Sequence, residues 1–385
     1  MTARTPPTIL DARVLSGSGG GPDKTLIHSP PFLADAGYRM LCTYLHDPAD
    51  PGFELLRKKA ELAGTPLISI ADRGPLDWRV VPRLVELCRR ERVKVWHGHD
   101  YKTNALGLVL RRFHPMRLVT TVHGWVHRTR RTPLYYLVDR LSLRFYEKVI
   151  CVSDDLMHAC RFAGVPKSRC LLLENGIDVA AFRRRRSSAE ARASLGFANV
   201  PTIGALGRLS AEKGFDILIR AVDRLLKKGL QLQLLIAGEG VEQNALATLI
   251  RELGRENEIR LLGYRNDLVP LYESMDIYAL SSYREGLPNV LLEAMAMEVP
   301  VVTTRIAGVP RLVTAGESGE LIDAGSVGQL AASLEKLLRD AELRKRNAVN
   351  GRRTVEERFS FAVRMANLTR IYDEMRIRGQ ASGAA

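Results

Sequence analysis

Two glutamates, Glu285 and Glu293, stand on either side of a predicted helix start. Glu285 comes just before Pro288, and proline is favoured at the first position of a helix because its missing N–H would be unsatisfied there. Glu293 follows about a turn and a half into that helix, roughly 7–8 Å along its axis. A helix start offers free N–H groups and a positive dipole end. The order carboxylate, anion site, carboxylate fits a ligand that joins a sugar, a diphosphate and a ribose.

Two cations are predicted to lie close to this helix start. Arg208 directly follows an apolar run at 202–206, and Lys213 precedes the next helix. Both side chains would project from the edge of the sheet at which the predicted strands end. Two fixed cations can neutralise a diphosphate leaving group without a metal. Glu293 has apolar neighbours, so we expect a mostly buried helix, and its carboxylate can accept two hydrogen bonds from the vicinal diol of a ribose.

The first half of the chain carries two further candidates, each directly after a predicted strand. The loop Gly17–Lys24 contains adjacent glycines, among them Gly20 and Gly21, which let the backbone approach a ligand with its N–H groups turned inward. It matches neither the dinucleotide fingerprint nor a P-loop. His123 ends the run 118–122, and ligands of open α/β sheets bind beyond the carboxyl ends of strands. A packing histidine is the alternative for His123.

A second histidine-rich segment, His97 to Asp100, resembles a metal site at first sight. No third cluster with ligand spacing accompanies it, so we expect no bound metal. The five cysteines include no C-x-x-C pair, which is typical of reduced thiols and favours a cytoplasmic location.

The elements that position these residues follow from an alternation of short apolar runs with helix-length segments, the pattern of parallel α/β sheets. We expect two doubly wound, Rossmann-like domains that face each other across a cleft. The first spans 1–190 and the second 195–360, and a helix at about 361–378 crosses back to the first. The predicted strands are 9–14, 39–44, 67–70, 93–97, 118–122, 149–152 and 170–173, then 202–206, 233–237, 259–262, 277–280, 299–303 and 319–322.

Length and charge agree with this division. At 385 residues the chain is too long for one ordinary core. Residues 1–190 carry +12 of the net charge of +14. A basic half could face nucleic acid, an anionic membrane, a phosphorylated acceptor or only solvent. No nucleic-acid-binding motif accompanies it, so nucleic acid is not an expected partner. No signal peptide or membrane-spanning helix is expected either.

These residues and their context are similar to the retaining glycosyltransferases of family 4, which have the GT-B fold. The Glu-x7-Glu spacing is specific within this context. The resemblance covers nearly the whole chain and is carried by GSGGGPDKTL, TVHG, VICVSDDL, ENGID, GRLSAEKGFDIL, LLIAGEG, AGVPRLV, GESGELI and the long segment LLGYRNDLVPLYESMDIYALSSYREGLPNVLLEAMAMEVPVV.

The resemblance implies an enzyme of the hexosyltransferase type that needs no metal and no cofactor besides its nucleotide-sugar donor. Arg208 and Lys213 would bind the diphosphate and stabilise the departing nucleotide. Glu285 would contact the donor sugar near the reacting carbon, and Glu293 would hold the ribose. His123 would lie over the donor sugar. The remaining implied contacts are Gly20 and Gly21 to phosphates or acceptor, Tyr264 and Arg265 to the base, and Gly286, Leu287, Pro288 and Asn289 around sugar and phosphate.

One segment departs from the family pattern. Pro22-Asp23-Lys24 replaces the Ala/Val-Glu-Arg that follows the glycine pair in many members. The variant resembles enzymes of exopolysaccharide and cell-envelope assembly, which implies a glycan or lipid-linked acceptor and a place at the inner face of the cytoplasmic membrane. Arg111, Arg112 and the arginines between 128 and 131 are candidates for contact with anionic lipid. A nucleotide-sugar epimerase of the GT-B fold and a catalytically silent nucleotide-sugar-binding protein are the alternatives.

Overall fold

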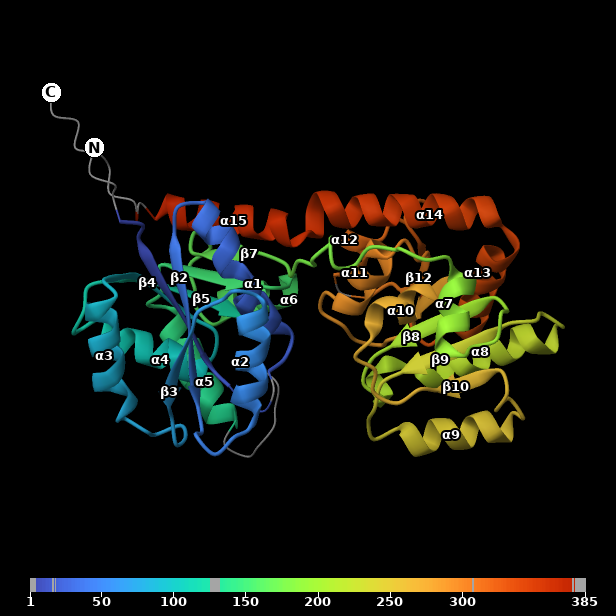
Figure 1. The fold of residues 1–385 in the computed structure, drawn as a ribbon, viewed down its shortest axis with the longest axis horizontal. Helices are drawn as coiled ribbons and strands as arrows, with labels where there is room; N and C mark the ends of the chain where they lie inside the picture. Colours follow the sequence, from blue (N-terminus) through green and yellow to red (C-terminus); the bar gives the residue numbers. More distant parts are fainter. Residues whose placement is uncertain are drawn as a thin grey trace, which may run out of the picture. The chain divides into compact units, whose positions relative to one another are not determined.

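The computed structural model describes residues 5–15, 17, 19–124, 132–306, 308–375 and 377. It divides into two compact units, drawn in Figure 1. Unit 1 comprises Met1–Asn175 and Arg364–Ala385, and unit 2 comprises Gly176–Val363. The segment 176–190, which the sequence analysis assigned to the first domain, therefore belongs to the second. The cleft expected between the domains stays a prediction.

The physical reason for this boundary is the arginine run at 183–186, which is bonded to unit 2. The Arg184 guanidinium donates to the carbonyl oxygens of Glu273 at 2.9 Å and Met297 at 3.2 Å. The buried Glu273 carboxylate accepts from the Arg185 N–H at 2.8 Å and pairs with Arg186 at 2.8 Å. Arg184 thus satisfies carbonyl groups at helix ends, which have no partner inside the helix, and Arg185 and Arg186 satisfy a buried carboxylate.

Unit 1 is a seven-stranded parallel sheet in the order β3-β2-β1-β4-β5-β6-β7. Each strand lies within two residues of its predicted bounds, because strands buried on both faces are nearly continuous apolar runs. Its strands are β1 (Thr8–Val14), β2 (Arg39–His46), β3 (Leu67–Ala71), β4 (Val93–Gly98), β5 (Arg117–Val122), β6 (Lys148–Cys151) and β7 (Cys170–Leu172). Its first helices are α1 (Gly21–Asp35), α2 (Gly52–Leu62), α3 (Val80–Arg90), α4 (Tyr101–Leu110), α5 (Thr132–Leu143) and α6 (Asp154–Phe162).

Unit 2 is a six-stranded parallel sheet in the order β10-β9-β8-β11-β12-β13. Its strands are β8 (Thr202–Leu206), β9 (Gln233–Ala237), β10 (Ile259–Leu261), β11 (Ile277–Leu280), β12 (Val301–Thr304) and β13 (Glu320–Ile322). Its helical elements are α7 (Ser188–Leu195), η1 (Ala211–Lys213), α8 (Phe215–Lys227), α9 (Gln243–Glu252), α10 (Leu268–Glu273), α11 (Asn289–Ala296), α12 (Val309–Leu312), α13 (Val327–Arg339), α14 (Ala341–Thr354) and η2 (Val355–Phe359).

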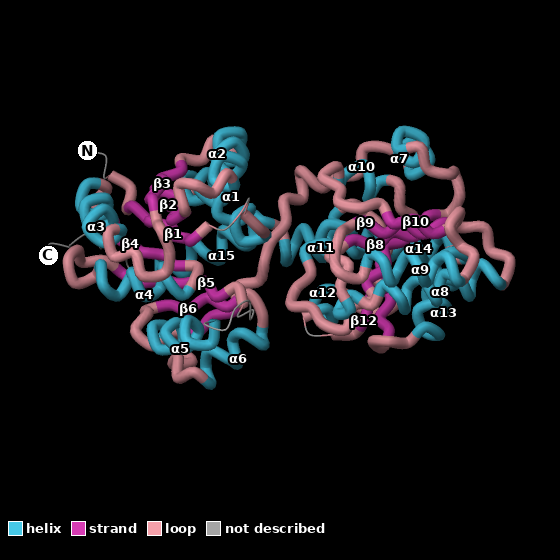
Figure 2. Tube along the Cα trace, turned by 90° about the horizontal axis from the view of Figure 1, so that it is seen from below, coloured by secondary structure: helices cyan, strands magenta, loops and turns pink. Residues whose placement is uncertain are grey.

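Both faces of the unit 2 sheet are covered, as a doubly wound fold requires. Successive strand residues face opposite sides. Thus Ile236 packs in one apolar cluster, with α8, α9 and α13, whereas its neighbours Leu235 and Ala237 pack in another, with α10 and α11. Figure 2 shows the helices flanking both sheets. In each unit the strand order reverses direction once, between β1 and β4 and between β8 and β11.

The last helix, α15 (Phe361–Glu374), packs on unit 1, which confirms the prediction that the chain returns to the first domain. The Tyr38 hydroxyl lies 2.6 Å from the Asp373 carboxylate, and the Tyr372 hydroxyl lies 2.7 Å from the His97 ring.

All five cysteines are buried, free thiols. Within the described residues, no helix is both long and apolar enough to span a membrane.

Candidate active site

The loops that follow β8 and β11 meet at the point where the strand order of unit 2 reverses. Lys213 lies at the end of the first loop and Glu285 in the second, and their side chains pair with Nζ and Oε1 2.6 Å apart. The Ser282 hydroxyl donates to the same carboxylate oxygen at 2.7 Å. Both charged side chains are mostly covered, with 15% and 11% of their surface exposed. Crevices at such reversal points are where open α/β sheets bind ligands.

A glycine allows these two loops to touch. Gly214 has a φ of +60°, and a Cβ added there would lie 2.4 Å from the Ser281 carbonyl oxygen. The Tyr283 N–H donates to the Glu212 carbonyl at 2.8 Å, and the Ser281 hydroxyl donates to the Lys213 carbonyl at 3.0 Å. The backbone itself therefore holds Lys213 against Glu285.

Helix α11 begins one residue later than predicted, at Asn289, and Pro288 is its N-cap. Pro288 has extended backbone angles and no side-chain oxygen, so it makes no side-chain cap for the first N–H groups of the helix. Gly286 and Leu287 complete the loop that leads into the helix. A Cβ added at Gly286 would meet no atom within 4 Å. This helix start thus lacks a side-chain cap and has open space beside it.

Glu293 is buried within α11, which confirms the prediction of a mostly buried helix. Its carboxylate accepts a hydrogen bond at 2.9 Å from the hydroxyl of Tyr272, which is itself fully buried. Burial, followed by the nearby Glu293, raises the pKa of Tyr272, so its hydroxyl keeps its proton and donates. Tyr272 was not among the predicted site residues. The sequence indicates it only by a tyrosine that directly follows the apolar residues 268–271, shortly before β11.

Three other predicted residues do not join the Lys213–Glu285 pair. Arg208 extends into solvent, with 74% of its side chain exposed, and lies 3.7 Å from Glu212. Arg265 pairs with Asp267, with Nε and Oδ1 2.7 Å apart, and Tyr264 is exposed. The predicted contacts of Arg208 with a diphosphate and of Tyr264 and Arg265 with a base stay predictions.

The glycine loop of unit 1 differs from its prediction. The Gly20 N–H donates to the Asp23 carboxylate at 2.6 Å, and Asp23 pairs with Arg13 at 2.8 Å. The N–H that was expected to face a ligand is therefore used inside the molecule. The reason is that Gly20 is the N-cap of α1, and Asp23 satisfies its free N–H. Gly21 is the first residue of that helix.

His123 follows β5 and contacts the segment after β4. Its Nε2 lies 2.9 Å from Nδ1 of His99, and Nε2 of His99 contacts the Asp11 carboxylate of β1. Burial lowers the pKa of His99 and His123 well below the usual value and raises that of Asp11 to about 6. Near neutral pH both histidines are therefore uncharged. The structure joins His123 to His99, a connection that the sequence analysis did not predict.

Asp11, His97 and His99 place possible metal-ligand atoms within 4.8 Å of one another. Their atoms already have protein partners, however. The two ring nitrogens of His97 lie 2.7 Å from the Tyr372 hydroxyl and 2.8 Å from the Thr121 hydroxyl, and those of His99 contact His123 and Asp11. A metal would have to displace the three hydrogen bonds and the close contact between His99 and Asp11, so the cluster is a network of protein contacts.

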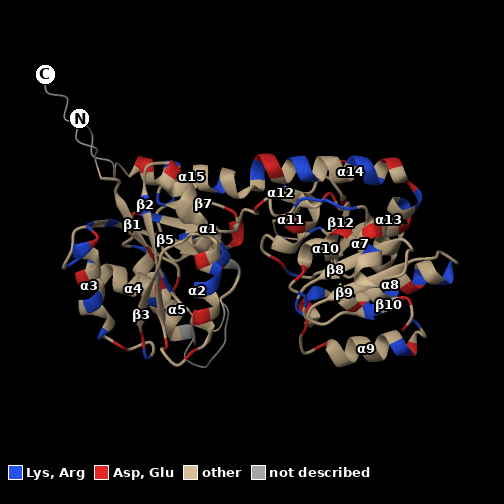
Figure 3. Cartoon of the chain, in the orientation of Figure 1, with Lys and Arg blue, Asp and Glu red and all other residues tan. Residues whose placement is uncertain are grey.

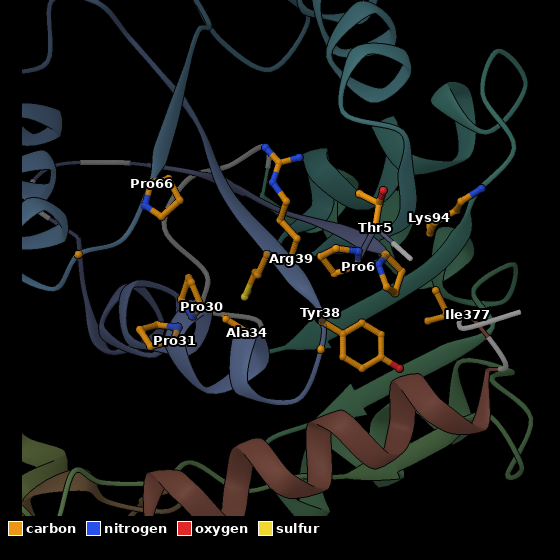
Figure 4. A pocket seen from close by; sticks show the side chains of 14 residues that line it. Thr5, Pro6, Pro30, Pro31, Ala34, Tyr38, Arg39, Pro66, Lys94 and Ile377 are labelled. Carbon is orange, nitrogen blue, oxygen red and sulfur yellow. The ribbon is translucent and has the colours of Figure 1, made fainter. Parts of the chain in front are cut away.

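A cavity of about 1210 Å³ lies at the amino ends of the unit 1 strands, whereas His123 follows the carboxyl end of β5 (Figure 4). Its lining includes Pro6, Arg39 and Lys94, which lie at the amino ends of β1, β2 and β4. Pro30, Pro31 and Ala34 of α1 line another side. The candidate residues follow the carboxyl ends of strands, so this cavity is not part of the candidate site.

Comparison with known proteins places the chain in a family. A family model described as "Glycosyl transferases group 1" matches residues 187–354, and one described as "Glycosyltransferase Family 4" matches residues 31–181. The D-inositol 3-phosphate glycosyltransferase of Corynebacterium glutamicum is 30% identical over 324 residues, which are 76% of this chain and 75% of that protein. The chain belongs to glycosyltransferase family 4. The recognition made from the motifs is thereby confirmed.

Other relatives are named for the biosynthesis of capsular polysaccharide and of the lipopolysaccharide core. The capsular polysaccharide biosynthesis glycosyltransferase CapM of Staphylococcus aureus is 28% identical over 62% of this chain. The lipopolysaccharide core biosynthesis glycosyltransferase LpsE of Rhizobium meliloti is 37% identical over 42% of this chain. The chain matches 64% of the length of CapM and 47% of that of LpsE.

Solved structures confirm the fold class. Alr3699/HepE of Anabaena in complex with UDP superimposes with a TM-score of 0.81 at 23% identity, over 95% of this chain and all of that one. A glycosyltransferase from Rickettsia africae superimposes with a TM-score of 0.79 at 20% identity, over 98% of this chain and all of that one. Both similarities show the two-domain GT-B fold that was expected for this family 4 member.

Proposed function

We propose that this protein transfers a sugar from a nucleoside-diphosphate sugar to a hydroxyl acceptor, with retention of the anomeric configuration and without a bound metal. The observation that carries the proposal is the Lys213–Glu285 pair, held at the reversal point of unit 2 beside the uncapped start of α11. This arrangement joins a fixed cation, a carboxylate and a helix start.

The donor binds on unit 2 in this proposal. The diphosphate lies against the start of α11, where N–H groups and the helix dipole favour an anion. Lys213 neutralises the charge that develops as the diphosphate leaves, and the exposed Arg208 exchanges its contact with Glu212 for one with the same group. Glu293, oriented by Tyr272, accepts hydrogen bonds from the ribose hydroxyls. UDP in a complex of Alr3699/HepE supports a nucleotide ligand for this fold.

In the proposed reaction the leaving group itself accepts the proton of the acceptor hydroxyl, so no separate base is needed. The acceptor hydroxyl attacks the anomeric carbon from the face that the diphosphate leaves, so the configuration is retained. Glu285 lies near the reacting carbon, and Lys213 supplies the positive charge that a metal ion would otherwise supply. The hydroxyl proton goes to the departing diphosphate.

The acceptor binds on unit 1, at the edge where its strands end. A cavity of about 530 Å³ follows β3 there and is lined by Arg73, Leu76, Trp78, Arg79 and Tyr135. Exposed aromatic and arginine side chains suit a glycan, since rings stack on sugars and guanidinium groups bind oxygens. The names of CapM and LpsE support a cell-envelope glycan or its lipid-linked precursor as acceptor.

A second feature of unit 1 supports contact with a membrane surface, which we propose to be the anionic surface at the cytoplasmic face. Four apolar side chains repeat at helical spacing along α5 and are 41% to 61% exposed: Leu134, Leu137, Val138 and Leu141. Phe145 continues the stripe and is 64% exposed. Lys and Arg are spread over both units (Figure 3), so charge alone does not single out a docking face. Of the arginines predicted for this role, Arg111 is partly exposed and pairs with Glu147, and those at 128–131 lie outside the described residues.

The test is a reaction of the protein with UDP-, GDP- and ADP-sugars and a lipid extract in the presence of EDTA. Analysis by mass spectrometry should show the free nucleoside diphosphate and a glycosylated acceptor from one donor. Glu285→Gln should abolish both products. A nucleotide sugar with altered stereochemistry and no released diphosphate would instead show an epimerase. Binding without any product from any donor would show a silent binding protein.

A further inference from the structure

Three polar side chains from neighbouring strands of unit 1 form a continuous chain that ends at His123. Asp11 lies in β1, His99 directly follows β4 and His123 directly follows β5, and these strands are adjacent in the sheet. The side chains of Asp11 and His99 are 3% and 4% exposed. Solvent therefore cannot supply their hydrogen-bond partners, and each group must satisfy the next.

The position of the proton between Asp11 and His99 follows from their close contact. A carboxylate oxygen and a bare ring nitrogen would repel each other, so one proton must lie between them. Burial keeps His99 neutral and leaves Asp11 with a pKa of about 6, so at neutral pH Asp11 is ionised. The proton is then carried by Nε2 of His99. A neutral imidazole has one N–H, so Nδ1 of His99 is bare.

The proton on the next ring, that of His123, is placed by its distance from His99. Nδ1 of His99 and Nε2 of His123 are 2.9 Å apart, a hydrogen-bond distance that requires one donor. Since Nδ1 of His99 is bare, Nε2 of His123 must donate. His123 is neutral as well, so its Nδ1 is bare. Among the described residues, this last nitrogen has no hydrogen-bond partner.

The groups around the chain do not compete for these nitrogens. His97 stacks on His99 with ring centres 4.6 Å apart, but its own nitrogens contact Tyr372 and Thr121. Arg13 of β1 pairs with Asp23 of α1. Arg364 of α15 donates to the carbonyl oxygens of Leu173 and Glu174. Both arginines favour the ionised form of Asp11. The surroundings thus support one arrangement of protons.

We propose that Asp11 and His99 are positioning residues that hold His123 in the tautomer with its proton on Nε2, so that Nδ1 accepts a hydrogen bond from a substrate hydroxyl. The proposal rests on the proposed function for the identity of that substrate, a sugar. A bare Nδ1 binds a hydroxyl, which can donate, and repels a phosphate or carboxylate oxygen. The chain of three residues therefore selects a sugar hydroxyl over an anion at His123.

The tautomer can be read directly, without substrate. Long-range ¹H–¹⁵N spectra distinguish protonated from bare ring nitrogens, and loss of one set of peaks in His123→Gln assigns the residue. Wild-type protein at pH 7.5 should carry the His123 proton on Nε2. Asp11→Asn, whose amide can donate or accept, should give a mixture of tautomers. A proton on Nδ1 in the wild type, or an unchanged tautomer in Asp11→Asn, would overturn the proposal.

Kinetics separate positioning from packing. His99→Gln keeps one donor for Asp11 and one acceptor for His123, whereas His99→Leu keeps neither. His99→Leu should lower kcat/KM for sugar transfer at least about tenfold, the effect of one lost hydrogen bond to substrate, and His99→Gln should restore most of it. His114→Gln, a histidine bonded to the Val93 carbonyl at the other end of β4, is the control and should keep wild-type activity.

Equal losses in His99→Gln and His99→Leu would overturn the proposal, because packing alone would then explain them. The spectra test the tautomer of His123, and the kinetics test the proposed function, so the two claims can be contradicted separately. An Nε2 tautomer in a protein that transfers no sugar would support the chain of three residues and contradict the proposed function. Both His99 variants should unfold cooperatively, and their NMR spectra should match the wild type away from His99 and His123. The loss of activity is then local.

Discussion

At the scale of single residues, the Lys213–Glu285 pair is the centre of the account. Two oppositely charged groups at 2.6 Å hold each other in place before any ligand arrives. A cation fixed in this way needs little rearrangement when negative charge develops on a leaving group, and such preorganisation is usually the largest electrostatic contribution to catalysis.

Replacement of Lys213 tests this contribution. Lys213→Ala should lower kcat by about 10²–10³, the usual effect of removing one group that stabilises developing charge. Lys227→Ala is the matched control, since Lys227 also pairs with a carboxylate, that of Asp223 at 2.7 Å, but lies exposed on α8. Steady-state kinetics of both variants give the answer. An activity of Lys213→Ala within threefold of the wild type would contradict the assignment.

Tyr272 offers a second test at the residue scale. Tyr272→Phe removes the hydrogen bond that orients Glu293, so KM for the donor should rise several-fold while kcat changes little. The free energy of unfolding should fall by about 1 kcal/mol. Tyr278→Phe is the control, because Tyr278 is equally buried but its hydroxyl lies 3.4 Å from the Leu206 carbonyl and does not contact Glu293. An unchanged donor KM in Tyr272→Phe would mean that Glu293 does not hold the ribose.

At the scale of elements, the contact between the loops after β8 and β11 depends on Gly214. Gly214→Ala places a Cβ 2.4 Å from the Ser281 carbonyl, so the loops must separate and Lys213 must move from Glu285. We expect sugar transfer to fall at least tenfold, with a loss of stability of about 1–3 kcal/mol. Gly254 has a similar φ of +65° but open space around it, so Gly254→Ala should cost only the backbone strain and keep activity. Equal activities of the two variants would contradict this role of the loop contact.

The strand ends of unit 1 give a prediction for pH. Burial lowers the pKa of His97 to about 3 and that of His99 and His123 as well. As pH falls below about 6.5, these histidines become protonated in the unfolded chain but stay neutral in the folded protein. The free energy of unfolding therefore decreases as pH falls from about 6.5. Asp11, with its raised pKa of about 6, acts in the opposite direction and contributes stability that is lost as pH rises. The three histidines outweigh it.

Unfolding should thus take up about two protons between pH 4 and 6, so the free energy of unfolding falls by roughly 2.7 kcal/mol for each unit that the pH falls. Urea denaturation at several pH values measures this slope. His97→Gln should reduce it by about 1.4 kcal/mol per pH unit, which separates this effect from that of the carboxylates. An unchanged slope in His97→Gln would contradict a neutral, buried His97.

Much of the element order was predictable because parallel strands buried on both faces are apolar runs that end in polar residues. Helix starts were less predictable. Helix α3 begins only at Val80, because Asp77 accepts hydrogen bonds from the N–H groups of Arg73 and Arg79 and holds the preceding residues as a loop. Likewise Asp23 satisfies the Gly20 N–H as a capping residue, and its pairing with Arg13 of β1 is a contact that no local pattern shows.

At the scale of the whole molecule, the sequence predicted which residues follow strand ends but not which of them touch. Lys213 and Glu285 are 72 positions apart, and their pairing depends on the adjacency of β8 and β11. The Asp11–His99–His123 chain likewise joins a residue within β1 to the residues that follow β4 and β5. A strand order is decided by packing over the whole unit, so spacing alone could not predict these contacts.

Membrane contact is a property at this scale. The double variant of Leu137→Ser and Leu141→Ser should weaken binding to vesicles that contain anionic phospholipid about tenfold or more, since two partly exposed apolar side chains no longer enter the interface. Leu62→Ser on α2 is the control, because Leu62 is 91% exposed outside the stripe. Sedimentation with vesicles measures the effect. Equal binding of the double variant and the control would remove α5 as the docking face.

The most direct measurement of the central claim is the shift in melting temperature of the whole protein with a panel of UDP-, GDP- and ADP-sugars. A donor at a hundred times its Kd stabilises the protein by about 2.7 kcal/mol, so one nucleotide class should raise the Tm by several degrees. The double variant of Lys213→Ala and Glu293→Ala should lose that rise. No rise with any nucleotide sugar, or an equal rise in the double variant, would contradict a sugar-nucleotide site at Lys213, Glu285 and Glu293.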